Sequence, residues 1–199
     1  MQKLLKVTGI TLLAVGAVWT ALTVWAERAG PKRRWKLGNQ AAKKRALIVY
    51  DPDPFYNLDE QVSRSFGQAL ADSGMQVTVA TVRAVEESPE QSIDLYVFCT
   101  NTYNWAPDWS ISSFIRRQAH LDGKPVVAIT VGSSGTERAQ KALEKIILNK
   151  KANLLDSRPL WLMKPNDESR AKESNITVAV SMAYSWGEEI AKQMTAHQH

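Results

Sequence analysis

The sequence contains little cysteine and little histidine, and this scarcity excludes several kinds of site. Its single cysteine, Cys99, lies inside an apolar run and has no partner for an internal disulfide. A lone thiol in such a run is most often a small core residue. His197 and His199 stand at the C-terminal end, which we expect to fray. The sequence therefore predicts neither a disulfide framework nor a zinc site of cysteine and histidine.

A basic surface for nucleic acid is also lacking, although the whole chain carries a net charge of +5. Residues 27–45 hold eight Lys or Arg and one acidic residue, Glu27. Residues 46–199 hold fifteen basic and nineteen acidic side chains, which gives this part a net charge of −4. Because the basic character belongs to one short segment and no basic-aromatic face stands out, we expect no nucleic-acid partner.

One long uncharged stretch is present near the N-terminus. Residues Val7–Ala26 carry no charge and are predominantly apolar, and about 20 residues at about 1.5 Å each cross a hydrocarbon core of about 30 Å. A cleaved secretory signal is the alternative, because two lysines precede the stretch and its last residues resemble a cleavage site. The run is longer than the apolar region of a signal, about 7–15 residues, and Trp19 and Trp25 suit a membrane interface. We predict a transmembrane anchor over residues 1–26, with the lipid bilayer as its partner.

The charges on either side of this stretch predict the orientation. Five basic residues follow within residues 27–36, against two lysines before it, and the positive-inside rule places the more basic side in the cytoplasm. Gly30-Pro31 and the polar residues to Lys44 predict a basic juxtamembrane linker over residues 27–44. We therefore expect a single-pass protein of the inner (cytoplasmic) membrane, with residues 45–199 as a cytoplasmic domain.

Apolar runs alternate with amphipathic stretches through residues 45–199, which predicts α/β structure. The polar segment Arg83–Ser92, which contains Pro89, is too broken for a helix, and Leu160–Met163 is expected to continue the last strand after a break at Pro159. We predict a doubly wound, five-stranded parallel sheet with helices on both faces. The strands are expected at Ala46–Tyr50, Met75–Val82, Ile93–Cys99, Lys124–Val131 and Ala152–Leu155; the helices at Leu58–Gly74, Ser110–His120, from a capping box at Ser134 to Asn149, and from Asn175.

Ligands of open α/β sheets bind at the carboxyl ends of the strands. Three loops follow strands there, at Asp51–Asn57, Thr100–Trp109 and Gly132–Gly135. Tyr103 or Trp105 offers a ring that can stack on a planar ligand, and such a contact is worth about 0.5–1.5 kcal/mol beyond burial. The equally simple interpretation is that these aromatic side chains pack over the sheet edge.

The stretches ALIVY, YVFCTNTYNW and GKPVVAITVGSSGTERAQKALEK, in this order, resemble the flavodoxin family. The resemblance implies a flavodoxin-like fold, an FMN cofactor and electron transfer with a redox partner protein at the membrane. In flavodoxins the first loop holds the phosphate of FMN, and the loops after the third and fourth strands flank its ring. By resemblance the cofactor site is Asn57 in the first loop, then Thr100, Asn101, Thr102, Tyr103, Asn104 and Trp105, and finally Gly132, Ser133, Ser134 and Gly135.

The first loop departs from the family pattern at the phosphate position. Pro52 and Pro54 have no N–H to offer, and Asp51 and Asp53 place negative charge where the phosphate would sit. Each like-charge contact at about 4 Å costs roughly 1 kcal/mol in water and several-fold more in a partly dry site. The alternative is therefore a flavin-free module of the same fold that serves binding or assembly at the membrane.

A third interpretation rests on Asp51 and Asp53 as a pair after a strand. This pattern is similar to the haloacid dehalogenase-like phosphohydrolases, in which one Asp attacks phosphorus and Mg²⁺ offsets the charge. The sequence shows no acidic pair after a later strand to complete the metal site, and Asp residues flanked by Pro are more often turn formers. No catalytic His or Ser constellation stands out, so the sequence leaves open whether the protein is an enzyme.

Overall fold

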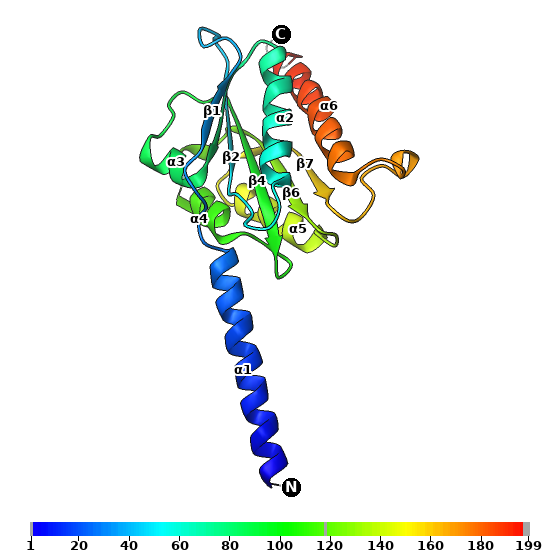
Figure 1. Cartoon of the computed structure of the whole chain (residues 1–199). Helices are drawn as coiled ribbons and strands as arrows, with labels where there is room; N and C mark the ends of the chain where they lie inside the picture. Colours follow the sequence, from blue (N-terminus) through cyan, green and yellow to red (C-terminus); the bar gives the residue numbers. More distant parts are fainter. Residues whose placement is uncertain (1, 118, 197–199) are drawn as a thin grey trace.

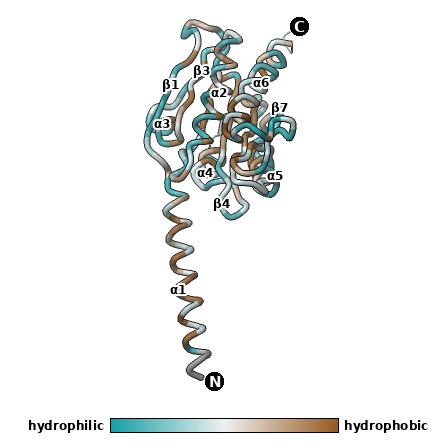
Figure 2. The backbone as a smooth tube through the Cα atoms, turned by 45° about the vertical axis from the view of Figure 1, so that its right-hand side comes forward, coloured by the Kyte–Doolittle hydropathy of each residue, from teal (hydrophilic) through white to brown (hydrophobic). Residues whose placement is uncertain are grey.

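The computed structural model describes residues 2–117 and 119–196, so the expectation for His197 and His199 lies outside them. Helix α1 (Gln2–Ala26) extends away from an α/β domain that contains the other elements (Figure 1). Its part Lys6–Ala26, 21 residues, is long and apolar enough to cross a membrane, and none of its apolar window is buried. Figure 2 shows hydrophobic residues along most of this helix.

The sheet has seven strands rather than the predicted five, in the order β1-β3-β2-β4-β6-β7 with β5 paired to β4. The five parallel strands of the prediction are present, and their spatial order is second, first, third, fourth, fifth along the chain, a doubly wound order. The two additional strands are short and antiparallel to their neighbours. The strands are β1 (Arg34–Leu37), β2 (Arg45–Tyr50), β3 (Gln76–Thr81), β4 (Leu95–Tyr103), β5 (Ala106–Pro107), β6 (Pro125–Gly132) and β7 (Asn153–Trp161).

Strand β1 lies within the segment that composition marks as a linker. Its four residues pair with β3 in register Arg34↔Ala80 to Leu37↔Val77. The Arg34 guanidinium donates to the carbonyl oxygens of Ala84 and Ser88, both at 2.6 Å. The open edge of β3 supplies the partners of the strand, and carbonyl groups in and just after α3 supply those of the Arg34 side chain. No local sequence pattern predicts partners so distant in the chain.

Helices α2 to α6 cover the two faces of the sheet (Figure 1). Alternate residues of β2 enter two separate cores: Ile48 and Tyr50 pack beneath α2 and α6, whereas Leu47 and Val49 pack against α3, α4 and α5. The predicted helices on both faces are thereby confirmed. The helices are α2 (Leu58–Asp72), α3 (Val82–Glu87), α4 (Trp109–Arg117), α5 (Glu137–Leu148) and α6 (Asn175–Ala196).

Three local expectations are corrected. Helix α3 occupies part of the segment judged too broken for a helix, because Val82 and Val85 are buried against the sheet. Strand β7 runs through Pro159, which an edge strand tolerates because one side of its ladder is free. The residue before α5 is Thr136, without a side-chain capping bond, so the capping box at Ser134 is wrong.

Candidate functional site

The loops that follow β2, β4 and β6 meet at one edge of the sheet, the edge from which α1 leaves (Figure 1). We call it the carboxyl edge. Parallel strands bring their carboxyl ends to the same side, which is why segments about 50 residues apart in the chain come together here. The contacts at this edge are dominated by buried or partly buried carboxylates.

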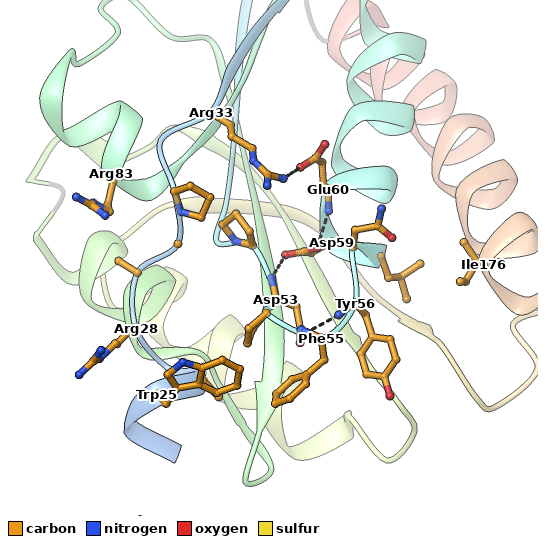
Figure 3. Close-up of a pocket in the computed structure, with 18 residues that line it drawn as sticks. Trp25, Arg28, Arg33, Asp53, Phe55, Tyr56, Asp59, Glu60, Arg83 and Ile176 are labelled. Carbon is orange, nitrogen blue, oxygen red and sulfur yellow. Dashed lines mark hydrogen bonds and ion pairs between the residues drawn. The ribbon is translucent and has the colours of Figure 1, made fainter. Parts of the chain in front are cut away.

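The side chain of Asp53 points into the first loop and accepts hydrogen bonds there. Its Oδ1 accepts hydrogen bonds from the backbone N–H groups of Phe55 (2.6 Å) and Tyr56 (2.9 Å), and its Oδ2 accepts from the Tyr103 hydroxyl at 2.7 Å. Burial, followed by this bond to Asp53, raises the pKa of Tyr103, so the hydroxyl stays protonated and donates. The backbone donors of the loop are therefore directed at a carboxylate of the protein itself (Figure 3).

A second carboxylate, that of Asp59, is fully buried in the first turn of α2. Its Oδ2 accepts from the backbone N–H of Asp53 at 2.9 Å and from Asn101 Nδ2 at 3.1 Å. Asn101 Nδ2 also donates to the carbonyl oxygen of Asp51 at 2.8 Å, so this amide joins the first loop to β4. Burial raises the pKa of Asp59 to about 6, and the bond from Asn101 opposes the rise.

A third carboxylate, Asp108, stands where the loop after β4 enters α4. Its Oδ2 accepts from Thr100 Oγ1 (2.8 Å) and from the Asn101 N–H (3.2 Å), and its Oδ1 accepts from the Ile111 N–H at 2.8 Å. Burial, together with the nearby charge of Asp51, raises the pKa of Asp108 to about 8. Sequence reasoning missed this residue, although an Asp just before a helix is a capping signal.

Two further carboxylates attach the segment after α1 to the carboxyl edge. Asp51 Oδ1 accepts from the Gly30 N–H at 2.9 Å, and Glu27 Oε2 accepts from the Trp109 N–H at 2.7 Å, at the start of α4. Burial raises the pKa of Asp51 to about 6 and also raises the pKa of Glu27. The entry into the domain is thus fixed by bonds to the same loops that would hold a ligand.

A small cavity of about 140 Å³ lies between the first loop and the carboxyl ends of β4 and β6. Pockets for ligands of drug size usually measure about 300–1,000 Å³. A Cβ on Gly132 would lie 2.8 Å from Thr136 Cγ2 and 3.2 Å from Thr102 Cβ, so this glycine is needed for packing between loops. The Thr102 hydroxyl is buried, and within residues 2–117 and 119–196 it has no hydrogen-bond partner. The cavity is lined by Asp53, Phe55, Tyr56, Leu58, Asn101, Thr102, Tyr103, Val131, Gly132, Ser133 and Leu162.

The structure brings together about half of the residues predicted for the cofactor. Asn101, Thr102, Tyr103, Gly132 and Ser133 line the cavity. The others do not line it. Asn57 accepts from Gln61 Nε2 at the start of α2, and Thr100 donates to Asp108. Asn104 and Trp105 form a turn, with φ of 49° and 59°, and Ser134 and Gly135 are exposed after β6.

Comparison with known proteins bears on the fold. No family model and no curated protein matches the chain. Among solved structures, a flavodoxin from the domain Archaea is 12% identical with a TM-score of 0.53, covering 76% of this chain and 99% of that one. Flavodoxin 2 from Bacillus cereus is 15% identical with a TM-score of 0.56, covering 73% of this chain and 99% of that one.

The domain has the flavodoxin fold. The flavodiiron protein from Giardia intestinalis contains a similar unit: it is 15% identical with a TM-score of 0.59, and the match covers 79% of this chain but 37% of that one. The predicted flavodoxin-like fold is confirmed. At identities this low the likeness extends to the fold alone, so the site must be judged from the residues of this chain.

The first loop of this flavodoxin-fold domain does not fit the phosphate of FMN. Its N–H groups at Asp53, Phe55 and Tyr56 already donate to carboxylates, and Pro52 and Pro54 have none to offer. A phosphate in the same place would have to displace a carboxylate that is bound by three donors. The loops after β4 and β6 leave a cavity, but the position for the phosphate is occupied by the protein itself.

The residues of the phosphohydrolase interpretation do not share a site. Asp51 accepts from Gly30, whereas Asp53 accepts from Phe55, Tyr56 and Tyr103. In the part of the chain that the structure describes, no group of three His, Cys, Asp or Glu side chains is placed to hold a metal ion. The arrangement therefore does not support a joint catalytic role for the two aspartates.

Proposed function

We propose that this chain is a single-pass membrane protein whose flavodoxin-fold domain serves as a binding or assembly module without a phosphate site for FMN. The observation that carries the proposal is the Asp53 carboxylate, which accepts from the N–H groups of Phe55 and Tyr56 and from the Tyr103 hydroxyl. FMN would bring a dianion beside Asp53 and Asp59, at a cost of roughly 1 kcal/mol per contact in water and several-fold more in a partly dry site.

Titration of the purified full-length chain in detergent with FMN tests this proposal. We expect no quenching of flavin fluorescence, because the donors of the first loop are already used. A triple variant, Pro52→Thr, Asp53→Ser and Pro54→Gly, frees the N–H groups of the loop and supplies two hydroxyls, so it is expected to bind FMN more tightly than the parent.

The matched control for this variant is Asp122→Ser, which removes one exposed negative charge elsewhere. It should leave FMN binding unchanged, and this separates a local effect of the loop from a general change in charge. A yellow preparation of the unmodified protein, or saturable binding of FMN to it, would contradict the flavin-free proposal.

The second candidate is electron transfer through FMN with a redox partner protein. It is favoured by the cavity between the loops after β4 and β6, and by the buried Thr102 hydroxyl on its wall. This candidate requires the Asp53 carboxylate to give up its hydrogen bonds from Phe55, Tyr56 and Tyr103 when the cofactor binds. Binding of FMN to the unmodified protein, weakened by Gly132→Val at the cavity wall, would support it over the first.

The anchor and its orientation complete the proposal. Lys6–Ala26 has the length and composition of a membrane span, and the basic residues that follow it favour the cytoplasmic side for the domain. Protease added to spheroplasts is expected to leave the domain intact and to digest it after the membrane is permeabilised. Digestion before permeabilisation would overturn the cytoplasmic orientation.

A further inference from the structure

Four large aromatic side chains are exposed at the carboxyl edge. Phe55 is 60% exposed, Tyr56 55%, Trp105 64% and Trp109 51%. Phe55 and Tyr56 come from the loop after β2, Trp105 from the turn after β4, and Trp109 from the first position of α4, so segments distant in the chain supply one group. Scattered exposed apolar residues are normal, but a group of large aromatic side chains at one edge indicates an interaction surface. We call these four residues the aromatic edge.

The aromatic edge is continuous with the end of α1. The Phe55 ring lies 5.3 Å from the Trp25 ring, centroid to centroid, in an edge-to-face arrangement. The turn after β4 also contacts α1, because Asn104 Nδ2 donates a hydrogen bond to Thr23 Oγ1 at 3.4 Å. Thr23 and Trp25 both belong to the candidate span Lys6–Ala26. Two loops of the domain therefore touch residues of the membrane span itself.

The dimensions of a bilayer indicate how deep in the membrane these contacts lie. The 21 residues of Lys6–Ala26 measure about 31 Å at about 1.5 Å per residue, close to the roughly 30 Å of a hydrocarbon core. Thr23 then lies about 4.5 Å inside the end of the helix, and each headgroup layer is roughly 5–7 Å thick. Loops that contact Thr23 and Trp25 must therefore reach the headgroup layer whenever α1 spans the bilayer.

Two exposed arginines at the same contact, Arg28 and Arg83, suit an anionic lipid surface. An open cleft of about 800 Å³ between the end of α1 and the first loop is lined by Arg28, Arg33 and Arg83 together with Trp25 and Phe55 (Figure 3). Of these cations, Arg33 is paired with Glu60. The carboxylates of Asp53, Asp59 and Glu60 line its inner side, where Asp53 and Asp59 accept hydrogen bonds from the protein itself. A basic residue near an anionic membrane contributes about 1 kcal/mol, which opposes the repulsion from residues 46–199, whose net charge is −4.

We propose that the carboxyl edge docks on the membrane that α1 crosses. Phe55, Tyr56, Trp105 and Trp109 enter the headgroup layer, where aromatic side chains are favoured, and the exposed Arg28 and Arg83 side chains at the rim of the cleft face anionic lipid headgroups. The inference rests on the membrane anchoring proposed above. It means that the edge at which flavodoxin-fold domains bind ligands is turned toward lipid, and that a partner reaches these loops along the membrane surface.

Site-specific fluorescence on the full-length chain in vesicles of phosphatidylcholine and phosphatidylglycerol tests the proposal. An environment-sensitive probe is attached to cysteines introduced by Tyr56→Cys and Trp109→Cys. The native Cys99 does not compete, because it is fully buried and burial raises the pKa of its thiol. Gly16→Cys, where an added Cβ meets nothing within 4 Å, reports on the span, and Asp122→Cys is the matched exposed control at the opposite edge.

Quenching by lipids with a nitroxide on the headgroup or acyl chain, and by aqueous iodide, distinguishes the outcomes. We expect the probes at 56 and 109 to be quenched by headgroup nitroxide severalfold more than the probe at 122, and to be correspondingly protected from iodide. If these probes behave like the one at 122 while the probe at 16 is quenched by acyl-chain nitroxide, α1 spans the membrane and the docking inference alone fails.

Two other outcomes also overturn the inference. If the probe at 16 is not quenched by lipid, the anchor itself fails and the docking inference fails with it. If the probes at 56 and 109 are protected from iodide but not quenched by lipid, another protein or a second copy of the chain covers the aromatic edge.

Discussion

Asp108 accepts three hydrogen bonds, from Thr100, Asn101 and Ile111, and is almost fully buried. Its pKa of about 8 in the folded protein exceeds the value of about 3.9 in an unfolded chain. The protonated form is therefore favoured by folding, and its contribution to stability is complete below about pH 4 and is lost as the pH rises through about 8. Stability should fall with rising pH.

We predict that the free energy of unfolding falls between pH 6 and 8.5, with a slope that approaches about 1.4 kcal/mol per pH unit. Asp108→Asn cannot ionise, so it should flatten this dependence even though it loses one acceptor. Urea unfolding of the detergent-solubilised chain across this range measures the effect. Asp122→Asn, a change of the same type at an exposed position, should keep the parental slope; equal slopes for all three proteins would refute the role of Asp108.

At the scale of elements, α2 and α6 pack closely because small residues lie between them. The Phe66 and Trp186 rings meet edge to face at 5.3 Å, and an added Cβ at Gly187 would lie 2.7 Å from the Phe66 carbonyl oxygen and 2.8 Å from Ala69 Cβ. Glycine to alanine in a helix ordinarily stabilises by about 1 kcal/mol. Here the added methyl group would clash with the backbone of α2.

We therefore predict that Gly187→Ala destabilises the protein by about 1–3 kcal/mol, the usual range for overpacking. Chemical denaturation measures this directly. Ser185→Ala, at an exposed position of the same helix, should change stability by less than about 0.5 kcal/mol. A stabilised Gly187→Ala protein would mean that α2 and α6 can move apart at little cost.

The pairing of β1 with β3 predicts slow exchange of its backbone amides. Residues 34–37 pair with β3, and the Thr81 N–H donates to the Arg33 carbonyl oxygen at 3.0 Å. Peptides that cover this strand should exchange more slowly than the turn at residues 39–43, because ladder hydrogen bonds protect amides. Equal exchange rates in the strand and in the turn would mean that β1 is not stably paired and that residues 27–44 are a flexible linker.

At the scale of the whole molecule, two mechanisms could hold the chain at a membrane: the apolar helix α1 and the basic segment after it. Several of those cations are used within the protein, since Lys32, Arg33 and Arg34 pair with Glu87, Glu60 and Glu90. We predict that washing membranes in high salt, which screens surface charge, leaves the protein bound, and that detergent releases it. Release by salt alone would indicate that α1 does not span the bilayer.

Much of the fold is visible in the sequence because its periodic signals are local. The apolar runs at β2 and β6, and the amphipathic pattern that includes Val62, Phe66 and Leu70, predict these strands and α2 at nearly their observed bounds. Strand β4 ends at Tyr103 rather than at Cys99, because its polar last residues pair with β5 and β6. The two additional strands are not predicted, because a four-residue edge strand and a two-residue strand have too few residues for a period to show.

The candidate site was harder to predict than the fold. The composition of the first loop, with Asp51, Pro52, Asp53 and Pro54, already predicts poor binding of phosphate. That Asp53 turns inward to accept from Phe55, Tyr56 and Tyr103 depends on β4 lying beside β2, a contact between residues 50 positions apart. The burial of Asp59 and Asp108 was missed for the same reason, since Asn101 of β4 donates to both. The bond from Ile111 to Asp108 is a local helix cap that the sequence could have indicated.

The sequence by itself determined the α/β alternation, the uncharged N-terminal stretch and the unusual charge of the first loop, because each depends on neighbouring residues. Only the tertiary structure decided which groups face that charge and where the end of α1 lies relative to the loops. Those arrangements follow from strand order and from packing between distant segments, which bring Trp25 to Phe55 and Glu27 to the start of α4. No local pattern in the chain encodes such pairings.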